Sequence, residues 1–200
     1  MASTATPQLV LVDLDEDLTT AWRTEFDEWA DDVEIHTARI DSVLAEVDAV
    51  VSAGNSYGEM NGGVDLAITR ALPQAQHRVW QHLGEQHFGY QPVGTAAIVP
   101  TGETSCRWLI YAPTMRVPMP LTNGRDIAIH DALWATLVAI TRHNRRVAVE
   151  DRISSLACPG FGTGYGKVPP ARAAALMSAA YRCWRAGPAS PRTRETLLTG

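Results

Sequence analysis

The chain has 200 residues, of which 46% are hydrophobic and 20% are charged, values typical of a single globular domain with one sizeable core. Its net charge of −5 argues against unspecific binding of a nucleic-acid backbone, which requires a basic stripe. A small anionic ligand is compatible with this charge, because backbone amides can bind it where Lys and Arg are scarce.

The first third of the chain alternates short apolar runs with one amphipathic stretch. Runs at residues 9–12, 33–36 and 49–51 predict buried strands. Between the first two runs, apolar residues at a spacing of three to four predict a helix, with Asp15 or Asp17 as its cap. The other face of this helix is acidic, and we interpret it as a solvated surface.

A glycine-rich loop follows the third apolar run. It contains Asn55, a turn-former, and four glycines, and a helical pattern begins after Asp65. This pattern continues to Phe88, and Pro73 is expected to end or kink the helix. The N-terminus of a helix presents unpaired backbone N–H groups and roughly half a positive charge. The loop is therefore a candidate cradle for phosphate.

The rest of the chain continues the alternation. We predict strands at 95–100, 108–112 and 153–158, and helices at 125–144 and 171–185. Strands that alternate with helices indicate an α/β fold, a three-layer α/β/α sandwich. Both glycine-rich loops follow strand carboxyl ends, so we expect them to converge on one crevice.

The second glycine-rich loop runs from Pro159 to Lys167. A Walker loop would need Gly at Phe161 and Ser or Thr at Val168. A dinucleotide fingerprint that starts at Gly160 would need Gly at Tyr165. Neither motif is present, and what remains is a strand, a Gly-x-Gly-Thr-Gly loop and a helix.

Two motifs together resemble the macro domain family, whose modules bind ADP-ribose. Asn55 with residues 62–65 (GGVD) resembles the family's NAAN…GGGVD signature. Asn55 and Asp65 lie ten residues apart, as in the hydrolytic branch of that family. The second loop resembles A-x-G-T-G-I-Y-G-F-P, and the strand-helix-strand at residues 9–37 is similar to a variant found in bacteria and phages. The resemblance implies a mixed, mostly parallel sheet.

The resemblance covers roughly residues 9–185 and departs from the family pattern at a few positions. Ser52 and Gly54 stand where the motif has Asn and Ala, Asn61 where Gly is usual, Tyr111 where His is usual, and Val168 where an aromatic residue is usual. We expect one macro domain at 9–185, a disordered N-terminus at 1–8 and a flexible C-terminal tail at 186–200.

The resemblance implies binding of ADP-ribose and hydrolysis of ADP-ribosyl derivatives: a mono-ADP-ribosyl ester, O-acetyl-ADP-ribose or ADP-ribose 1″-phosphate. Asp65 would orient water and Asn55 would bond the distal ribose, which makes these two the candidate catalytic residues. Each has a plainer interpretation: Asp65 stabilises the first turn of a helix, and Asn55 holds its own turn by side-chain bonds. The alternative function is a non-catalytic module that binds ADP-ribose or a related nucleotide signal.

The resemblance also implies a set of ligand-binding residues. Asp41 would accept a bond from the adenine amino group, or it caps the next short helix. Arg116 would contact the diphosphate, or it forms a surface ion pair. The full set is Asp41, Ser42, Asn55, Gly62, Gly63, Val64, Arg116, Gly160, Phe161, Gly162, Thr163, Gly164 and Tyr165.

Metal and cofactor signals are weak in this sequence. Three histidines fall five residues apart and share no helical face, and the three cysteines form no C-x-x-C pair. We interpret Cys158 as inert core rather than a nucleophile. We expect no metal, no cofactor, no membrane or nucleic-acid partner, and a monomer with ADP-ribose or an ADP-ribosylated substrate as its ligand. Residues 1–8 lack the pattern of a signal peptide and no apolar run spans a bilayer, so cytoplasmic is our default expectation.

Overall fold

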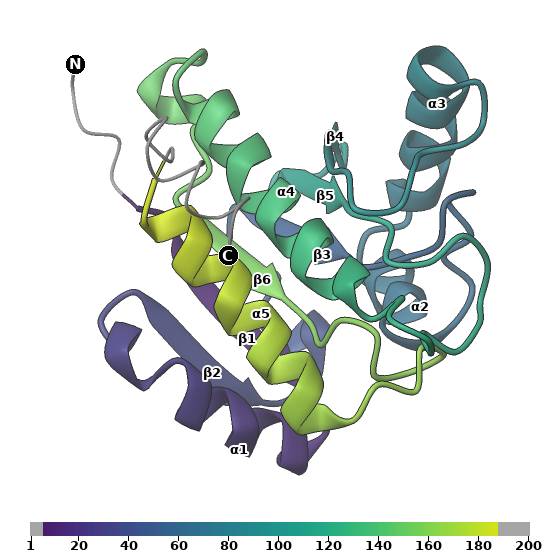
Figure 1. The fold of residues 1–200 in the computed structure, drawn as a ribbon. Coiled ribbons are helices and arrows are strands. Elements are labelled where there is room, and N and C mark those ends of the chain that lie inside the picture. Colours follow the sequence, from purple (N-terminus) through teal and green to yellow (C-terminus); the bar gives the residue numbers. More distant parts are fainter. Residues whose placement is uncertain (1–5, 188–200) are drawn as a thin grey trace, which may run out of the picture.

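The computed structural model describes residues 6–187, which form one sheet between two layers of helices (Figure 1). The strands are β1 (Gln8–Asp13), β2 (Val33–Thr37), β3 (Ala49–Ser52), β4 (Ala97–Pro100), β5 (Trp108–Tyr111) and β6 (Ser155–Cys158). The helices are α1 (Glu16–Glu25), α2 (Gly63–Ala71), α3 (Ala75–His87), α4 (Ile127–Asn144) and α5 (Pro170–Arg185), with short 3-10 turns η1 (Asp27–Trp29), η2 (Ile40–Ser42) and η3 (Val149–Asp151).

The sheet has six strands in the order β2-β1-β6-β3-β5-β4. All neighbouring pairs are parallel except β4 with β5, which is antiparallel. The predicted three-layer sandwich with a mixed, mostly parallel sheet is confirmed. Because β1, β3 and β6 are parallel neighbours, the segments that follow them leave the same edge of the sheet.

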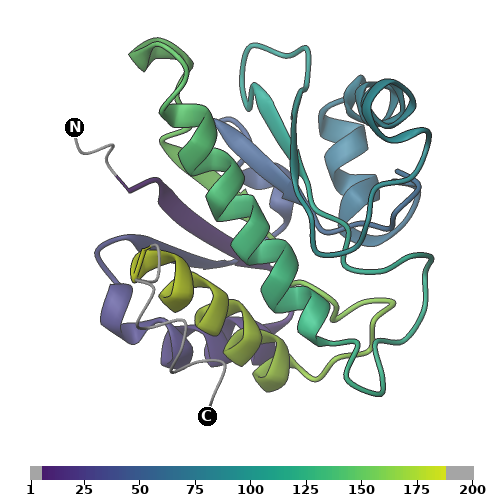
Figure 2. The same ribbon diagram turned by 45° about the horizontal axis from the view of Figure 1, so that its top comes forward.

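Each face of the sheet is covered by a separate apolar cluster. Along β1, Leu9 and Leu11 pack in one cluster with residues of α1, α4 and α5, whereas Val10 and Val12 pack in the other with residues of α2 and α3. Figures 1 and 2 show α1, α4 and α5 side by side on one face. This alternation is what a strand buried on both faces requires.

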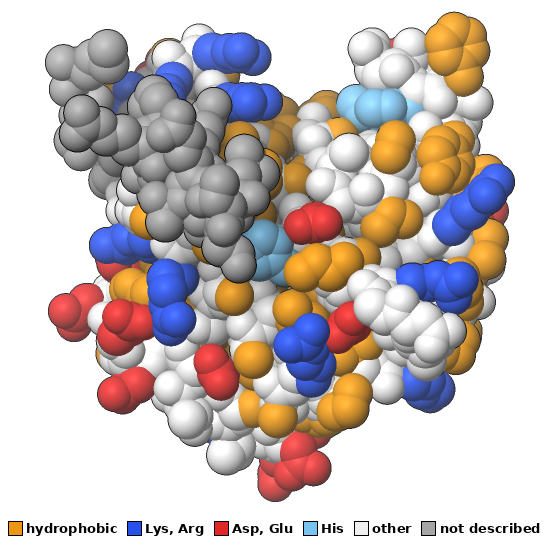
Figure 3. Space-filling model, in the orientation of Figure 1, with side chains coloured by type: hydrophobic (Ala, Val, Ile, Leu, Met, Phe, Trp, Pro, Cys, Tyr) orange, Lys and Arg blue, Asp and Glu red, His pale blue; other side chains and the backbone are white. Residues whose placement is uncertain are grey.

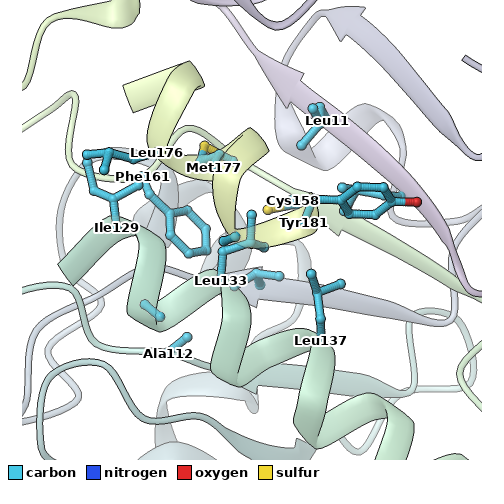
Figure 4. Close-up of a cluster of buried hydrophobic side chains, with 14 of the residues drawn as sticks. Leu11, Ala112, Ile129, Leu133, Leu137, Cys158, Phe161, Leu176, Met177 and Tyr181 are labelled. Atoms are coloured by element: carbon cyan, nitrogen blue, oxygen red, sulfur yellow. The ribbon is translucent and has the colours of Figure 1, made fainter. Parts of the chain in front are cut away.

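The larger cluster lies between α4, α5 and the sheet. Figure 4 shows Leu133 of α4 near Phe161; Leu137, Met177 and Cys158 belong to the same cluster. Cys158 is fully buried, and burial raises the pKa of its thiol, which agrees with the interpretation as inert core. Phe161, in the middle of the second glycine-rich loop, is also fully buried and anchors that loop to the core.

Most of the observed helix and strand boundaries lie within two residues of those that the sequence predicts. Asp15 caps α1, since its Oδ1 accepts from the amides of Asp17 and Leu18. The helix predicted up to Phe88 divides at Leu72–Gln74 into α2 and α3, where Pro73 interrupts the pattern. The strand predicted from Thr95 starts only at Ala97, because Thr95 donates its hydroxyl to the carbonyl of Pro92 in a turn.

Of the two segments predicted to be disordered, 1–8 and 186–200, residues 1–5 and 188–200 lie outside the described residues, so this prediction is not tested there. Gln8 is the first residue of β1. Among residues 6–187, no helix combines the length and apolar character needed to cross a bilayer. On the face drawn in Figure 3, Lys and Arg side chains are scattered among acidic ones rather than gathered into one stripe.

Candidate functional site

The loop between β3 and α2 is fastened to the segment that follows β5. Asn55 and Met115 form an isolated parallel bridge, and the Thr114 amide donates to the carbonyl of Gly54 over 3.0 Å. The buried hydroxyl of Tyr111 donates to the carbonyl of Asn55 and accepts from the amide of Gly58. The loop is thus held by tertiary contacts as well as by its glycines.

The side chain of Asn55 is used inside its own loop. Its Oδ1 accepts from the amide of Tyr57 over 3.1 Å, and its Nδ2 donates to the carbonyl of Glu59 over 2.9 Å. These bonds are those of the plainer interpretation, a residue that holds its turn. An amide side chain still has one further N–H and one further lone pair, and Asn55 lines a cleft.

Asp65 is a buried carboxylate in the first turn of α2. Its side chain is 9% exposed, and Oδ1 accepts a 2.8 Å hydrogen bond from the hydroxyl of Ser52 at the end of β3. Burial raises the pKa of Asp65 to about 6, and the bond from Ser52 acts in the opposite direction. A carboxylate with such a pKa is ionised near neutral pH and yet able to accept a proton.

The raised pKa of Asp65 predicts a stability that depends on pH. The unfolded chain loses this proton near the ordinary pKa of an aspartic acid, 3.8, whereas the folded chain keeps it up to about pH 6. Between these values the folded state binds more protons, so its stability falls as pH rises and levels off above pH 6. Relative to Asp65→Asn, the wild type should therefore lose about 3 kcal/mol over this range. Urea unfolding of both proteins across the range measures this difference, and parallel stability curves would contradict it.

The second glycine-rich loop is fastened to β1 and to the segment before α4. The amide of Gly160 donates to Oδ2 of Asp13 over 3.1 Å, and the amide of Leu121 donates to the carbonyl of Gly166 over 2.8 Å. A Cβ at Gly160 would stand 2.4 Å from Leu18 and 2.8 Å from Asp13, so a larger residue does not fit there. The loop passes close to β1 because this position has no side chain.

Both loops line one cleft of about 480 Å³ at the carboxyl edge of the sheet. Tyr165 reaches from the second loop to the first, since a Cβ at Gly62 would lie 3.3 Å from its hydroxyl. Tyr165 is 60% exposed. Of the predicted ligand-binding residues, the cleft is lined by Asn55, Gly62, Gly63, Val64, Gly160, Gly162, Thr163, Gly164 and Tyr165, and also by the candidate catalytic residue Asp65.

Four predicted ligand-binding residues do not line the cleft. Asp41 and Ser42 are exposed in η2, and Asp41 neither faces the cleft nor caps a helix: its carboxylate pairs with the guanidinium of Arg39 at 3.0 Å. This partner holds the pKa of Asp41 below its usual value. Arg116 is exposed, and its guanidinium lies over the ring of Tyr90 at 5.8 Å. The side chain of Phe161 is in the core, which leaves only its backbone for a ligand.

The structure adds cleft residues that the sequence reasoning missed. Asp13, Arg39, Gly54, Glu59 and Met115 also line the cleft. Asp13 could have been found, because it directly follows the apolar run 9–12, and the carboxyl ends of parallel strands share an edge. Arg39 gave no such signal. Within residues 6–187 there is no cluster of three or more His, Cys, Asp or Glu that could hold a metal ion.

Comparison with known proteins identifies the family. The family model for the Macro domain matches residues 51–177, more than half of the chain. The chain belongs to the macro domain family. The match begins inside β3 and ends inside α5, and it contains both glycine-rich loops.

Relatives of this macro domain occur in bacteria and archaea. An uncharacterized protein of Mycobacterium tuberculosis is 34% identical over 159 residues, which are 78% of this chain and 38% of that protein. The chain thus spans well under half the length of that relative. An uncharacterized protein of Pyrobaculum aerophilum is 31% identical over 153 residues, 75% of each chain.

Solved macrodomains share the fold. The Oceanobacillus iheyensis macrodomain with MES bound has a TM-score of 0.62 at 18% identity, and the match covers 79% of this chain and 84% of that one. The macrodomain of Mycobacterium tuberculosis DarG has a TM-score of 0.53 at 22% identity, covering 70% and 86%. At this level of identity the likeness concerns the fold.

Proposed function

We propose that this macro domain binds ADP-ribose and hydrolyses ADP-ribosyl derivatives with a water oriented by Asp65. The observation that supports this most is the single cleft between two glycine-rich loops, with a buried carboxylate in its wall. The N-terminus of α2 and the loop after Gly160, residues 161–164, supply backbone amides, which suit a diphosphate. The O. iheyensis macrodomain, which has the same fold, has been solved with ADP.

The proposed chemistry uses the carboxylate of Asp65 as a general base. As the water oxygen bonds to the electrophilic carbon at the distal ribose, Asp65 accepts one proton from that water. The bond to the leaving group breaks, and the proton then passes to the leaving group. A pKa of about 6 suits this role, because the base is ionised at neutral pH and its basicity is close to the working pH.

A second candidate, a binding module without turnover, is favoured by one observation. The Asn55 side chain, which would hold the distal ribose, already bonds to the amide of Tyr57 and the carbonyl of Glu59. Binding of the diphosphate by backbone amides does not need this side chain. Both candidates therefore share the same cleft and the same ligand.

Two measurements decide between these functions. Calorimetry with ADP-ribose should show saturable binding, and absence of binding at millimolar ligand would overturn both candidates. Incubation with an ADP-ribosylated peptide and with ADP-ribose 1″-phosphate, followed by product analysis, should show release of ADP-ribose. Binding without any product would favour the binding module.

A further inference from the structure

The two oxygens of the Asp65 carboxylate have different surroundings. Oδ1 accepts the 2.8 Å hydrogen bond from Ser52, whose side chain is fully buried at the end of β3. Oδ2 faces Gly54, because a Cβ at that position would stand only 3.1 Å from it and 3.3 Å from the hydroxyl of Ser52. Gly54 and Asp65 both line the cleft.

We infer that Ser52 and Gly54 are positioning residues that give the two oxygens of the Asp65 carboxylate different roles. Ser52 fixes Oδ1 within the protein, and Gly54 leaves Oδ2 open to the cleft. This inference rests on the proposed function for its consequence in turnover, because Oδ2 is then the oxygen that meets the water. Its structural content, one oxygen held and one oxygen open, is testable without turnover.

The role of Ser52 follows from the burial of the carboxylate. An ionised carboxylate out of water needs hydrogen-bond donors, and a bond to a charged acceptor is stronger than a neutral one. Ser52 is the side chain within 6–187 that supplies such a bond to Asp65. Without it, Oδ1 would lose this donor and the side chain would be free to rotate.

The role of Gly54 is one of space rather than of backbone conformation. Its φ is outside the left-handed region that favours glycine, so Ala can adopt the same backbone. An added methyl group would be closer to Oδ2 than an ordinary van der Waals contact, and it would cover that oxygen from the cleft. The two sequence departures Ser52 and Gly54 therefore act on the same carboxylate.

Other ionisable groups near Asp65 are few and do not replace these contacts. The ring of Tyr111 on β5 would lie 3.6 Å from a Cβ at Gly54. The remaining titratable groups that line the cleft are Asp13, Arg39, Glu59 and Tyr165. Burial and Ser52 remain the two causes that set the acidity of Asp65.

The test is a carbon-13 NMR titration of the Asp65 side-chain carboxyl, assigned by its loss in Asp65→Asn. Ser52→Ala should raise the midpoint by about one pH unit, because one bond to the charged form is lost. Gly54→Ala should also raise it, because the methyl group keeps water from Oδ2. Ser178→Ala, which removes a buried serine bonded to the carbonyl of Glu25, and Gly84→Ala, whose added Cβ meets nothing within 4 Å, should leave the midpoint unchanged.

Turnover is measured on the same folded variants as a second readout. In Ser52→Ala, the acid limb of the pH profile of turnover should shift to higher pH together with the carboxyl midpoint. Gly54→Ala should lower turnover at least ~10-fold at every pH. Unchanged carboxyl midpoints in Ser52→Ala and Gly54→Ala would overturn the inference. A wild type that binds ADP-ribose without turnover would overturn only the proposed hydrolysis, since the titration still decides how the carboxylate is held.

Discussion

Asp65→Asn is expected to lower turnover of an ADP-ribosyl substrate by ~10²–10⁴-fold and to leave the affinity for ADP-ribose largely intact. The amide of Asn cannot accept a proton from water. It has nearly the same shape as the carboxylate, however, and can still pair with the hydroxyl of Ser52. The diphosphate would be held by backbone amides that this change does not touch. Single-turnover rates with an ADP-ribosylated peptide and calorimetry with ADP-ribose measure the two quantities.

The matched control is Asp17→Asn. Asp17 is also an acid in the first turn of a helix, α1, but it is exposed and does not line the cleft. Both substitutions remove a carboxylate from the first turn of a helix, where an exposed charge such as that of Asp17 is worth ~0.3–1 kcal/mol. Turnover should be unchanged in the control. Equal turnover in Asp65→Asn and wild type would leave Asp65 only the plainer role in its helix.

The second large effect is expected from Gly166→Ala, in the loop that follows β6. A Cβ at this position would stand 2.3 Å from the carbonyl oxygen of Gly162 and 2.9 Å from its Cα. These are backbone atoms, which cannot move aside as the end of a flexible side chain can. The loop must open, and the bond from Leu121 to the carbonyl of Gly166 is then strained. We expect a loss of more than ~4 kcal/mol of unfolding free energy and of ADP-ribose binding.

Gly164→Ala in the same loop is the control for stability. A Cβ there would meet nothing within 4 Å, and its backbone is outside the left-handed region. Its unfolding free energy in urea should stay within ~0.5 kcal/mol of the wild type. A Gly166→Ala variant as stable as this control would show that the loop adapts without cost.

The family motifs were a better guide to the cleft than to each contact within it. Glycines of both loops and Asp65 line the cleft, as the motif spacing indicated. Such positions can be predicted because turns that need glycine and the starts of helices depend on only a few neighbouring residues. Asp41 and Arg116 matched family positions too, yet they do not line it. Arg39 pairs with Asp41, and the ring of Tyr90 lies against Arg116. Partners of this kind depend on the tertiary structure and not on the local sequence.

The sequence by itself determined the alternation of strands and helices, the two glycine-rich loops and the family. Apolar periodicity, glycine and proline act over a few residues, so they can be read along the chain. Only the tertiary structure decided that Asp13 holds Gly160, that Tyr165 reaches Gly62, and that Ser52 and Gly54 share one carboxylate. These contacts join segments that a parallel sheet brings to one edge, and the surroundings of a buried charge depend on which atoms meet there.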